Sequence, residues 1–83
     1  MDTTTTESST LSAVFDIRRT NLRLLAERYD GPSQLAAKLQ MRHPSYLSQL
    51  IGPNPTRDIS ERTARAYEQK LGLAAGWLDV VRG

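Results

Sequence analysis

The chain has 83 residues, 39% of them hydrophobic, and eleven basic against nine acidic side chains give it a net charge of +2. This length allows one small domain, with little stability to spare for a deep catalytic cleft. The chain has no cysteine, no secretory signal and no apolar stretch near the roughly 20 residues that span a bilayer, so we expect a cytoplasmic protein without disulfides, thiolate metal sites or membrane contacts.

The N-terminal residues 1–10 are predicted to be a disordered tail, followed by one domain over residues 11–83. The tail has four consecutive threonines, two serines and no apolar anchor beyond Met1. It therefore offers too little apolar burial to offset the entropy lost on ordering.

The first predicted helix runs from Asp16, a candidate N-cap, to a stop at Gly31. Its apolar side chains recur with helical spacing, at Leu22, Leu25, Ala26 and Tyr29. Three arginines fall outside this apolar stripe and are expected to be solvated: Arg18, Arg19 and Arg23.

Two short helices are predicted next, separated by the polar residues 40–43. Ser33 is the expected cap of the first, which ends at Leu39. The second has Pro44 in its first turn and ends near Ile51, because the following sequence GPNP forbids continuation.

A fourth helix is predicted between its N-cap Ser60 and Gly72, where Leu73 is placed to close a Schellman-type cap. A last helical turn covers residues 75–79. No segment alternates as a strand does, so the predicted fold is all-α, a compact bundle of four to five short helices.

Charge is unevenly distributed along the chain. Nine of the eleven basic residues are arginine, which suits bidentate contacts with phosphates or bases. Asp and Glu are absent from residues 31–57, and this gap favours a surface that meets a polyanion. On the fourth helix, Arg62 and Arg65 are expected to be solvated, the latter paired with Glu61.

The second short helix has two unlike faces. One face collects its leucines and isoleucine, whereas the other has small hydroxyls and an amide where a solvated helix more often carries Glu and Lys. Such groups can bond base edges or phosphate oxygens, and Gln49 can pair in bidentate fashion with adenine. The combination favours a recognition helix over an ordinary solvated surface.

The stretch from Arg18 to Asp79 resembles the helix-turn-helix domain of the lambda-repressor-like superfamily, in particular small prophage regulators of Gram-negative bacteria. The resemblance is carried by SQLAAKL, PSYLSQLIG, ISERTARAYEQKLGL and GWLD. It implies that the first two runs form the paired helices and that the second enters the major groove. Two departures, Gln40 in place of the usual glycine and one extra residue between Leu39 and Leu47, predict a longer turn.

The resemblance also implies a set of DNA contacts. Base contacts in the major groove are expected from Ser45, Tyr46, Ser48 and Gln49. Contacts with the DNA backbone or the groove edge are expected from Ser33, Gln34, Lys38, Arg42, His43, Asn54, Thr56 and Arg57.

The C-terminal apolar residues allow two interpretations. Trp77 either plugs the core, or it joins Leu78, Val80 and Val81 in a patch that pairs two protomers. The resemblance supports the patch, because similar regulators commonly dimerise through this end. A twofold pair would set two recognition helices about 34 Å apart and imply a pseudo-palindromic operator.

No metal site, cofactor, catalytic centre or small-molecule substrate is expected. His43 is the only histidine and has no carboxylate nearby in the sequence. Ser45 and Ser48 lack a second histidine or an acid that would activate them, and the chain has no glycine-rich phosphate loop.

The sequence therefore predicts a non-enzymatic, sequence-specific regulator of transcription that binds double-stranded DNA. We expect a phage or prophage repressor that acts as a homodimer in the nucleoid, or in the host cytoplasm if it is phage-encoded. The alternative is a protein-interaction module, such as an antitoxin-like or adaptor domain, that uses the same helices to hold a protein partner.

Overall fold

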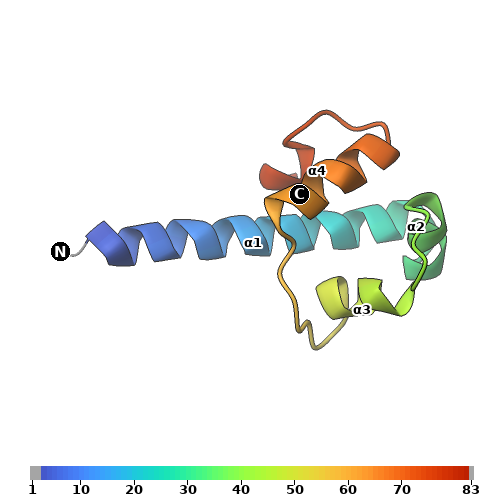
Figure 1. Cartoon of the computed structure of the whole chain (residues 1–83), viewed down its shortest axis with the longest axis horizontal. Coiled ribbons are helices and arrows are strands. Elements are labelled where there is room, and N and C mark those ends of the chain that lie inside the picture. Colours follow the sequence, from blue (N-terminus) through green and yellow to red (C-terminus); the bar gives the residue numbers. More distant parts are fainter. Residues whose placement is uncertain (1–2, 83) are drawn as a thin grey trace.

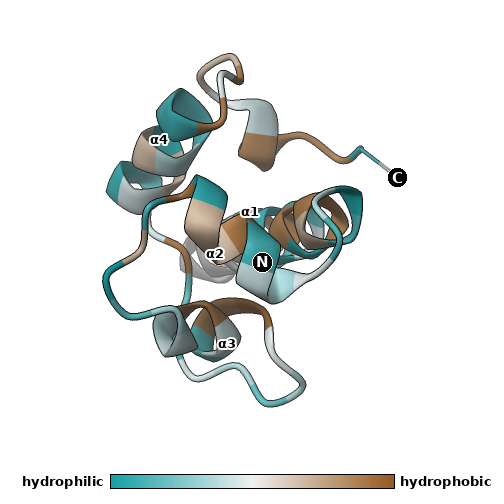
Figure 2. Ribbon diagram, turned by 90° about the vertical axis from the view of Figure 1, so that its right-hand side faces the viewer, coloured by the Kyte–Doolittle hydropathy of each residue, from teal (hydrophilic) through white to brown (hydrophobic). Residues whose placement is uncertain are grey.

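One long helix forms the axis on which the other elements are arranged. The computed structural model describes the backbone of residues 3–82 and the side chains of residues 13–82. Its elements are α1 (Thr3–Arg28), α2 (Pro32–Lys38), α3 (Ser45–Ile51), α4 (Glu61–Lys70) and a 3-10 turn, η1 (Trp77–Asp79). Figures 1 and 2 show α3 and α4 on opposite sides of α1, with α2 at its C-terminal end. The predicted all-α bundle is confirmed, with no strand in the described backbone.

Helix α1 begins earlier than the sequence indicates. It starts at Thr3, so residues 3–10, for which we predict a disordered tail, continue the helix in the structure. Adding a residue to an existing helix costs far less free energy than nucleating a new helix. The composition of the threonine run does not reveal that it adjoins an existing helix. The domain boundary at residue 11 stays a prediction.

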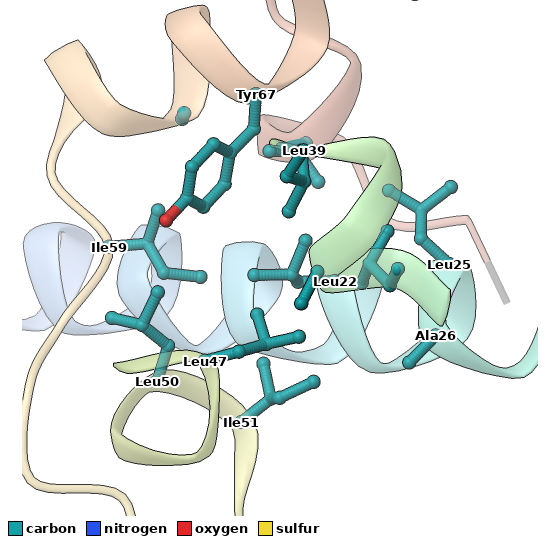
Figure 3. Close-up of a cluster of buried hydrophobic side chains, with 13 residues drawn as sticks. Leu22, Leu25, Ala26, Leu39, Leu47, Leu50, Ile51, Ile59 and Tyr67 are labelled. Carbon is teal, nitrogen blue, oxygen red and sulfur yellow. The ribbon is translucent and has the colours of Figure 1, made fainter. Parts of the chain in front are cut away.

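The core fills the space between α1 and the other helices (Figure 3). Leu22 of α1 is fully buried, and Tyr67 of α4 points its ring toward Ile59 on the segment that enters α4. Of the apolar stripe predicted for the first helix, Leu22, Leu25 and Ala26 are confirmed as buried and Tyr29 is half-buried. The remaining buried apolar residues come from the later elements: Leu35, Ala36, Leu39, Leu47, Leu50, Ile51, Ile59, Ala64, Tyr67 and Leu78. Because every helix contributes, α3 is fixed by the same core that holds α1 and α2.

Helix caps follow the sequence in part. Ser60 caps α4 as predicted, since its hydroxyl accepts the Thr63 N–H at 3.2 Å. The prediction that Ser33 caps α2 is wrong, because Gly31 is the N-cap and Pro32 is the first helical residue. A proline there loses no helical hydrogen bond, so the helix begins without a side-chain cap.

The turn after α2 is a Schellman motif. The Met41 N–H donates to the Ala36 carbonyl and the Gln40 N–H to the Ala37 carbonyl, both at 3.1 Å, and Gln40 has a φ of 56°. The predicted motif after α4 is confirmed, with Gly72 at a φ of 71°. Gln40 therefore adopts the left-handed conformation that a glycine would adopt without strain.

A network of ion pairs joins α1, α4 and η1. Arg18 is 5% exposed; its Nε lies 2.7 Å from Asp79 Oδ1 and its Nη1 donates to the Ile59 carbonyl at 2.9 Å. Arg65 Nη2 reaches the same Oδ1 at 2.8 Å, and its Nε lies 2.8 Å from Glu68 Oε1. The prediction that Arg18 is solvated is wrong, because it is buried and paired with Asp79. The prediction that Arg65 is solvated beside Glu61 is also wrong, because it is half-buried and paired with Glu68 and Asp79.

Glu68 anchors the loop that leads to η1. Its side chain is 1% exposed, and its two oxygens accept the backbone N–H groups of Gly76 at 3.0 Å and Leu78 at 2.7 Å. Hydrogen bonds from Arg18 and then Arg65 hold the pKa of Asp79 below its ordinary value. The ionised carboxylate thus stabilises the fold above its unfolded-state pKa, and this stability is lost as pH falls through the folded-state pKa.

The strained turn gives a first prediction. The left-handed conformation costs a residue with a Cβ roughly 1 to 2 kcal/mol of strain. A glycine removes this strain, but its greater conformational freedom in the unfolded chain offsets part of the gain in stability. We expect Gln40→Gly to raise the free energy of unfolding in urea by about 0.5 to 1 kcal/mol. Gln40→Ala is the control, since it keeps the Cβ and should bring no gain; a glycine variant no more stable than this control would contradict the strained turn.

Candidate nucleic-acid interface

Helix α3 divides into a buried face and an open polar face. Its apolar side chains, Leu47, Leu50 and Ile51, pack into the core (Figure 3). Of the four predicted base-contact residues, Ser45 and Ser48 are exposed, and Tyr46 and Gln49 are half-buried. The Ser48 hydroxyl donates to the Ser45 carbonyl at 2.7 Å, which keeps this side chain close to the helix surface.

The start of α2 lies beside this polar face. Ser33 lines a surface hollow together with Ser45 and Ser48, and Gln34 next to it is exposed. The first turn of a helix carries backbone N–H groups without helical acceptors, which suits a bound anion. The structure thus brings together the start of α2 and the open face of α3, as the helix-turn-helix resemblance implies.

The turn between α2 and α3 borders the other side of the face. Arg42 and His43 are exposed and share a hollow with Tyr46 of α3 and Tyr67 of α4. Burial raises the pKa of Tyr67, so its hydroxyl is neutral here. Lys70 of α4 donates to the carbonyl of Leu39 at 3.0 Å and so supports the C-terminal end of α2.

The loop after α3 folds back onto the end of that helix. The Gln49 carbonyl accepts the backbone N–H groups of Thr56 at 2.9 Å and Arg57 at 3.2 Å. Arg57 Nε also donates to Gln49 Oε1 at 2.9 Å, and its guanidinium carbon lies 5.8 Å from the centre of the Tyr46 ring. Three predicted site residues, Tyr46, Gln49 and Arg57, therefore form one cluster.

Two further candidates lie apart from these clusters. Asn54 is exposed in the loop after α3. Lys38 is exposed at the C-terminal end of α2, whereas Ser33 lies at its N-terminal end. Both side chains are accessible, and their roles stay predictions.

Two arginines that we predict to be solvated instead hold α3 in place. Arg19 Nε donates to the Leu50 carbonyl at 2.9 Å, and Arg23 donates from Nε to the Ile51 carbonyl at 2.8 Å and from Nη2 to the Gly52 carbonyl at 2.9 Å. Arg19 Nη2 also reaches the Arg57 carbonyl at 3.1 Å and Asp58 Oδ1 at 3.0 Å. The prediction of solvation is wrong for Arg19, whose side chain is 15% exposed. Arg23 is exposed as predicted, although its guanidinium group also binds the end of α3.

The sequence contains a partial signal for this clamp. Helix α3 has no basic residue in its last turn, and Gly52 after it is extended, with a φ of −67°. The last carbonyls of such a helix have no partner of their own and need donors from elsewhere. Arg19 and Arg23 are four residues apart on α1 and so lie on one face, where they can supply those donors together.

The chain is similar in sequence to a known prophage repressor. The chain is 35% identical over 69 residues, 83% of its length, to the prophage repressor CohE of Escherichia coli strain K12, and spans 30% of the length of that relative. The chain is a homologue of a prophage repressor. This similarity confirms the resemblance to prophage regulators. Neither a protein-family model nor a solved structure matches the chain.

The C-terminal patch of this repressor homologue is smaller than predicted. Leu78 is 0% exposed and belongs to the core, so it cannot contact a second protomer in this fold. Trp77 is half-buried against the core, with the guanidinium groups of Arg28 and Arg82 over its ring at 5.9 and 4.5 Å. Val80 at 55% and Val81 at 71% exposed are the open part of the patch.

The described residues offer neither a metal site nor a membrane-spanning helix. Within the described residues, no group of three or more His, Asp or Glu side chains could hold a metal ion. In that same part of the chain, no helix combines the length and the apolar character needed to cross a bilayer.

The clamp on α3 gives a second prediction. Arg19→Met keeps the aliphatic part of the side chain but leaves the Leu50 and Arg57 carbonyls without their donor. We expect the free energy of unfolding in urea to fall by about 1 to 3 kcal/mol. Arg62→Met, an equal loss of charge at an exposed position of α4, should change it by less than about 0.5 kcal/mol. Equal effects from the two variants would contradict the clamp.

Proposed function

We propose that the chain is a sequence-specific, double-stranded-DNA-binding regulator of transcription of the repressor type, which places the open face of α3 in the major groove. The observation that carries the proposal is the position of that face. It is bordered by the start of α2, the turn before α3 and the loop after it, all within residues 31–57, which contain no carboxylate. Asp58, the first carboxylate after this gap, is paired with Arg19 at 3.0 Å.

The proposed contacts divide by chemistry. Ser45, Tyr46, Ser48 and Gln49 would meet base edges, because a helix that enters the major groove presents its exposed side chains there. Phosphates and the groove edge would be met by the accessible groups around them: Ser33, Gln34, Lys38, Arg42, His43, Asn54, Thr56 and Arg57. Binding of this kind requires neither a cofactor nor a catalytic step, and it would take place in the cytoplasm.

The net charge overstates the attraction for DNA. Seven basic side chains make internal hydrogen bonds or ion pairs: Arg18, Arg19, Arg23, Arg57, Arg65, Lys70 and Arg82. Around α3 the cations proposed to face a phosphate are Lys38, Arg42 and Arg57, the last of which also binds Gln49 through its Nε. Three such contacts per protomer correspond to a slope of roughly −3 in a plot of log affinity against log salt.

Pairing of two protomers belongs to the same proposal. Val80 and Val81 are exposed. They belong to the C-terminal segment, which lies on the α4 side of α1, away from α3 (Figure 2), so protomers that meet there would leave both α3 faces open. A twofold pair on successive major grooves would recognise a pseudo-palindromic operator with half-sites about 34 Å apart.

A second candidate function is a protein-interaction module of the antitoxin or adaptor kind. It is supported by a mostly apolar hollow beside α3, whose lining includes Ala26, Pro32, Ile51 and Pro53. Such a site would bury apolar surface against a protein partner and show little dependence on salt. Salt dependence therefore separates the two functions.

The test is a titration of duplex DNA selected from a random pool, repeated at several salt concentrations. We expect affinity to fall steeply with salt, and Arg42→Ala to weaken binding to all sequences alike while making the slope shallower by about 0.9. Arg28→Ala is the control, because Arg28 faces Trp77 and not α3, and it should leave the slope unchanged. A slope near zero, with no preference over random DNA, would exclude the proposed function.

A further inference from the structure

We propose that Arg57 orients the side chain of Gln49 so that it donates hydrogen bonds to acceptors on the DNA bases. This position of the protein then selects guanine in the major groove and discriminates against adenine. The inference rests on the proposed function and deepens it. It arises from one contact, the 2.9 Å hydrogen bond from Arg57 Nε to Gln49 Oε1.

The identity of the amide atom that faces Arg57 follows from chemistry. A guanidinium group has only donors, so the side-chain atom of Gln49 that it meets must be the carbonyl oxygen. The amide NH₂ group then points away from Arg57. Gln49 thus turns its donors toward a partner outside the protein, while its side-chain oxygen accepts from Arg57 with one of its two lone pairs.

The pair is held from several directions, which makes it a fixed feature of the surface. The Gln49 backbone carbonyl binds the N–H groups of Thr56 and Arg57, so the loop cannot swing away without breaking these bonds. The Arg57 guanidinium lies over the ring of Tyr46, and the Arg57 carbonyl accepts from Arg19. Such preorganisation lowers the entropy that recognition would otherwise cost.

The four bases respond differently to a cluster of donors. A bidentate contact between glutamine and adenine needs the amide oxygen to accept from adenine N6. Arg57 already donates to that oxygen, so the N6 donor of adenine would come up against the guanidinium donors there. Guanine offers two neighbouring acceptors, O6 and N7, and no donor in the major groove, so it satisfies the cluster fully. Thymine offers one acceptor and cytosine a donor, so both fit less well.

The experiment measures base preference at a single position of the binding site. Duplex DNA that the wild-type chain selects from a random pool is first bound to Gln49→Ala, which locates the base pair whose preference is lost. All four base pairs are then introduced at that position and titrated with wild type, Arg57→Ala and Arg42→Ala at one salt concentration. Arg42→Ala is the matched control, because it removes a charge from the same surface without touching Gln49.

We expect the wild type to bind guanine over adenine by about tenfold at this position. Arg57→Ala should shift this ratio toward adenine by at least about fivefold, because it frees the amide oxygen. Arg42→Ala should weaken binding to both bases equally and leave the ratio unchanged.

The contrary outcomes separate the inference from the proposed function. A wild-type preference for adenine, an Arg57→Ala ratio equal to that of the wild type, or a Gln49→Ala variant with unaltered preferences at every position would each overturn the inference and leave sequence-specific binding intact. A wild-type chain that selects no sequence from the pool would overturn both.

Discussion

The interaction on which the rest of the molecule depends is the binding of backbone carbonyls by arginine side chains of α1. Arg18 holds the segment that enters α4, and Arg19 and Arg23 hold the end of α3. Helix ends leave carbonyls without partners, and a donor that carries a full charge binds them more strongly than a neutral one. One helix thereby fixes the elements on both of its sides (Figure 1).

This constraint continues into the candidate interface. Arg19 binds the Arg57 carbonyl, the Arg57 side chain binds Gln49, and Gln49 lies on the open face of α3. A chain of direct contacts therefore joins the core-facing side of α1 to an expected base contact. The accessible cations are few, which makes the polar groups of α3 more important than net charge for any discrimination between DNA sequences.

The sequence predicts those parts of the fold that local patterns encode. Apolar periodicity locates the buried faces of the helices, and the Ser60 cap and the Gly72 motif are correct in detail. The sequence indicates that the end of α3 needs outside donors, but it does not indicate which carbonyl each arginine binds, because the acceptors lie far away in the sequence and only the tertiary fold brings them together. The burial of Leu78 is not predicted from the sequence for a related reason. It depends on the loop before η1, which Glu68 holds in place. The exposure of Ser33, Ser45 and Arg57 is consistent with their expected roles, whereas the coupling of Gln49 to Arg57 has no sequence signal.

The central claim is that the open face of α3, with the start of α2 and the loop at Arg57, is the surface that meets DNA. The most direct measurement is a nuclear magnetic resonance titration of the ¹⁵N-labelled chain with duplex DNA selected from a random pool. The account predicts the largest shift changes at the amides of Ser33, Ser45, Gln49 and Arg57, with small changes at Val81. Changes confined to α4 and the C-terminal segment, or no change at any amide, would contradict it.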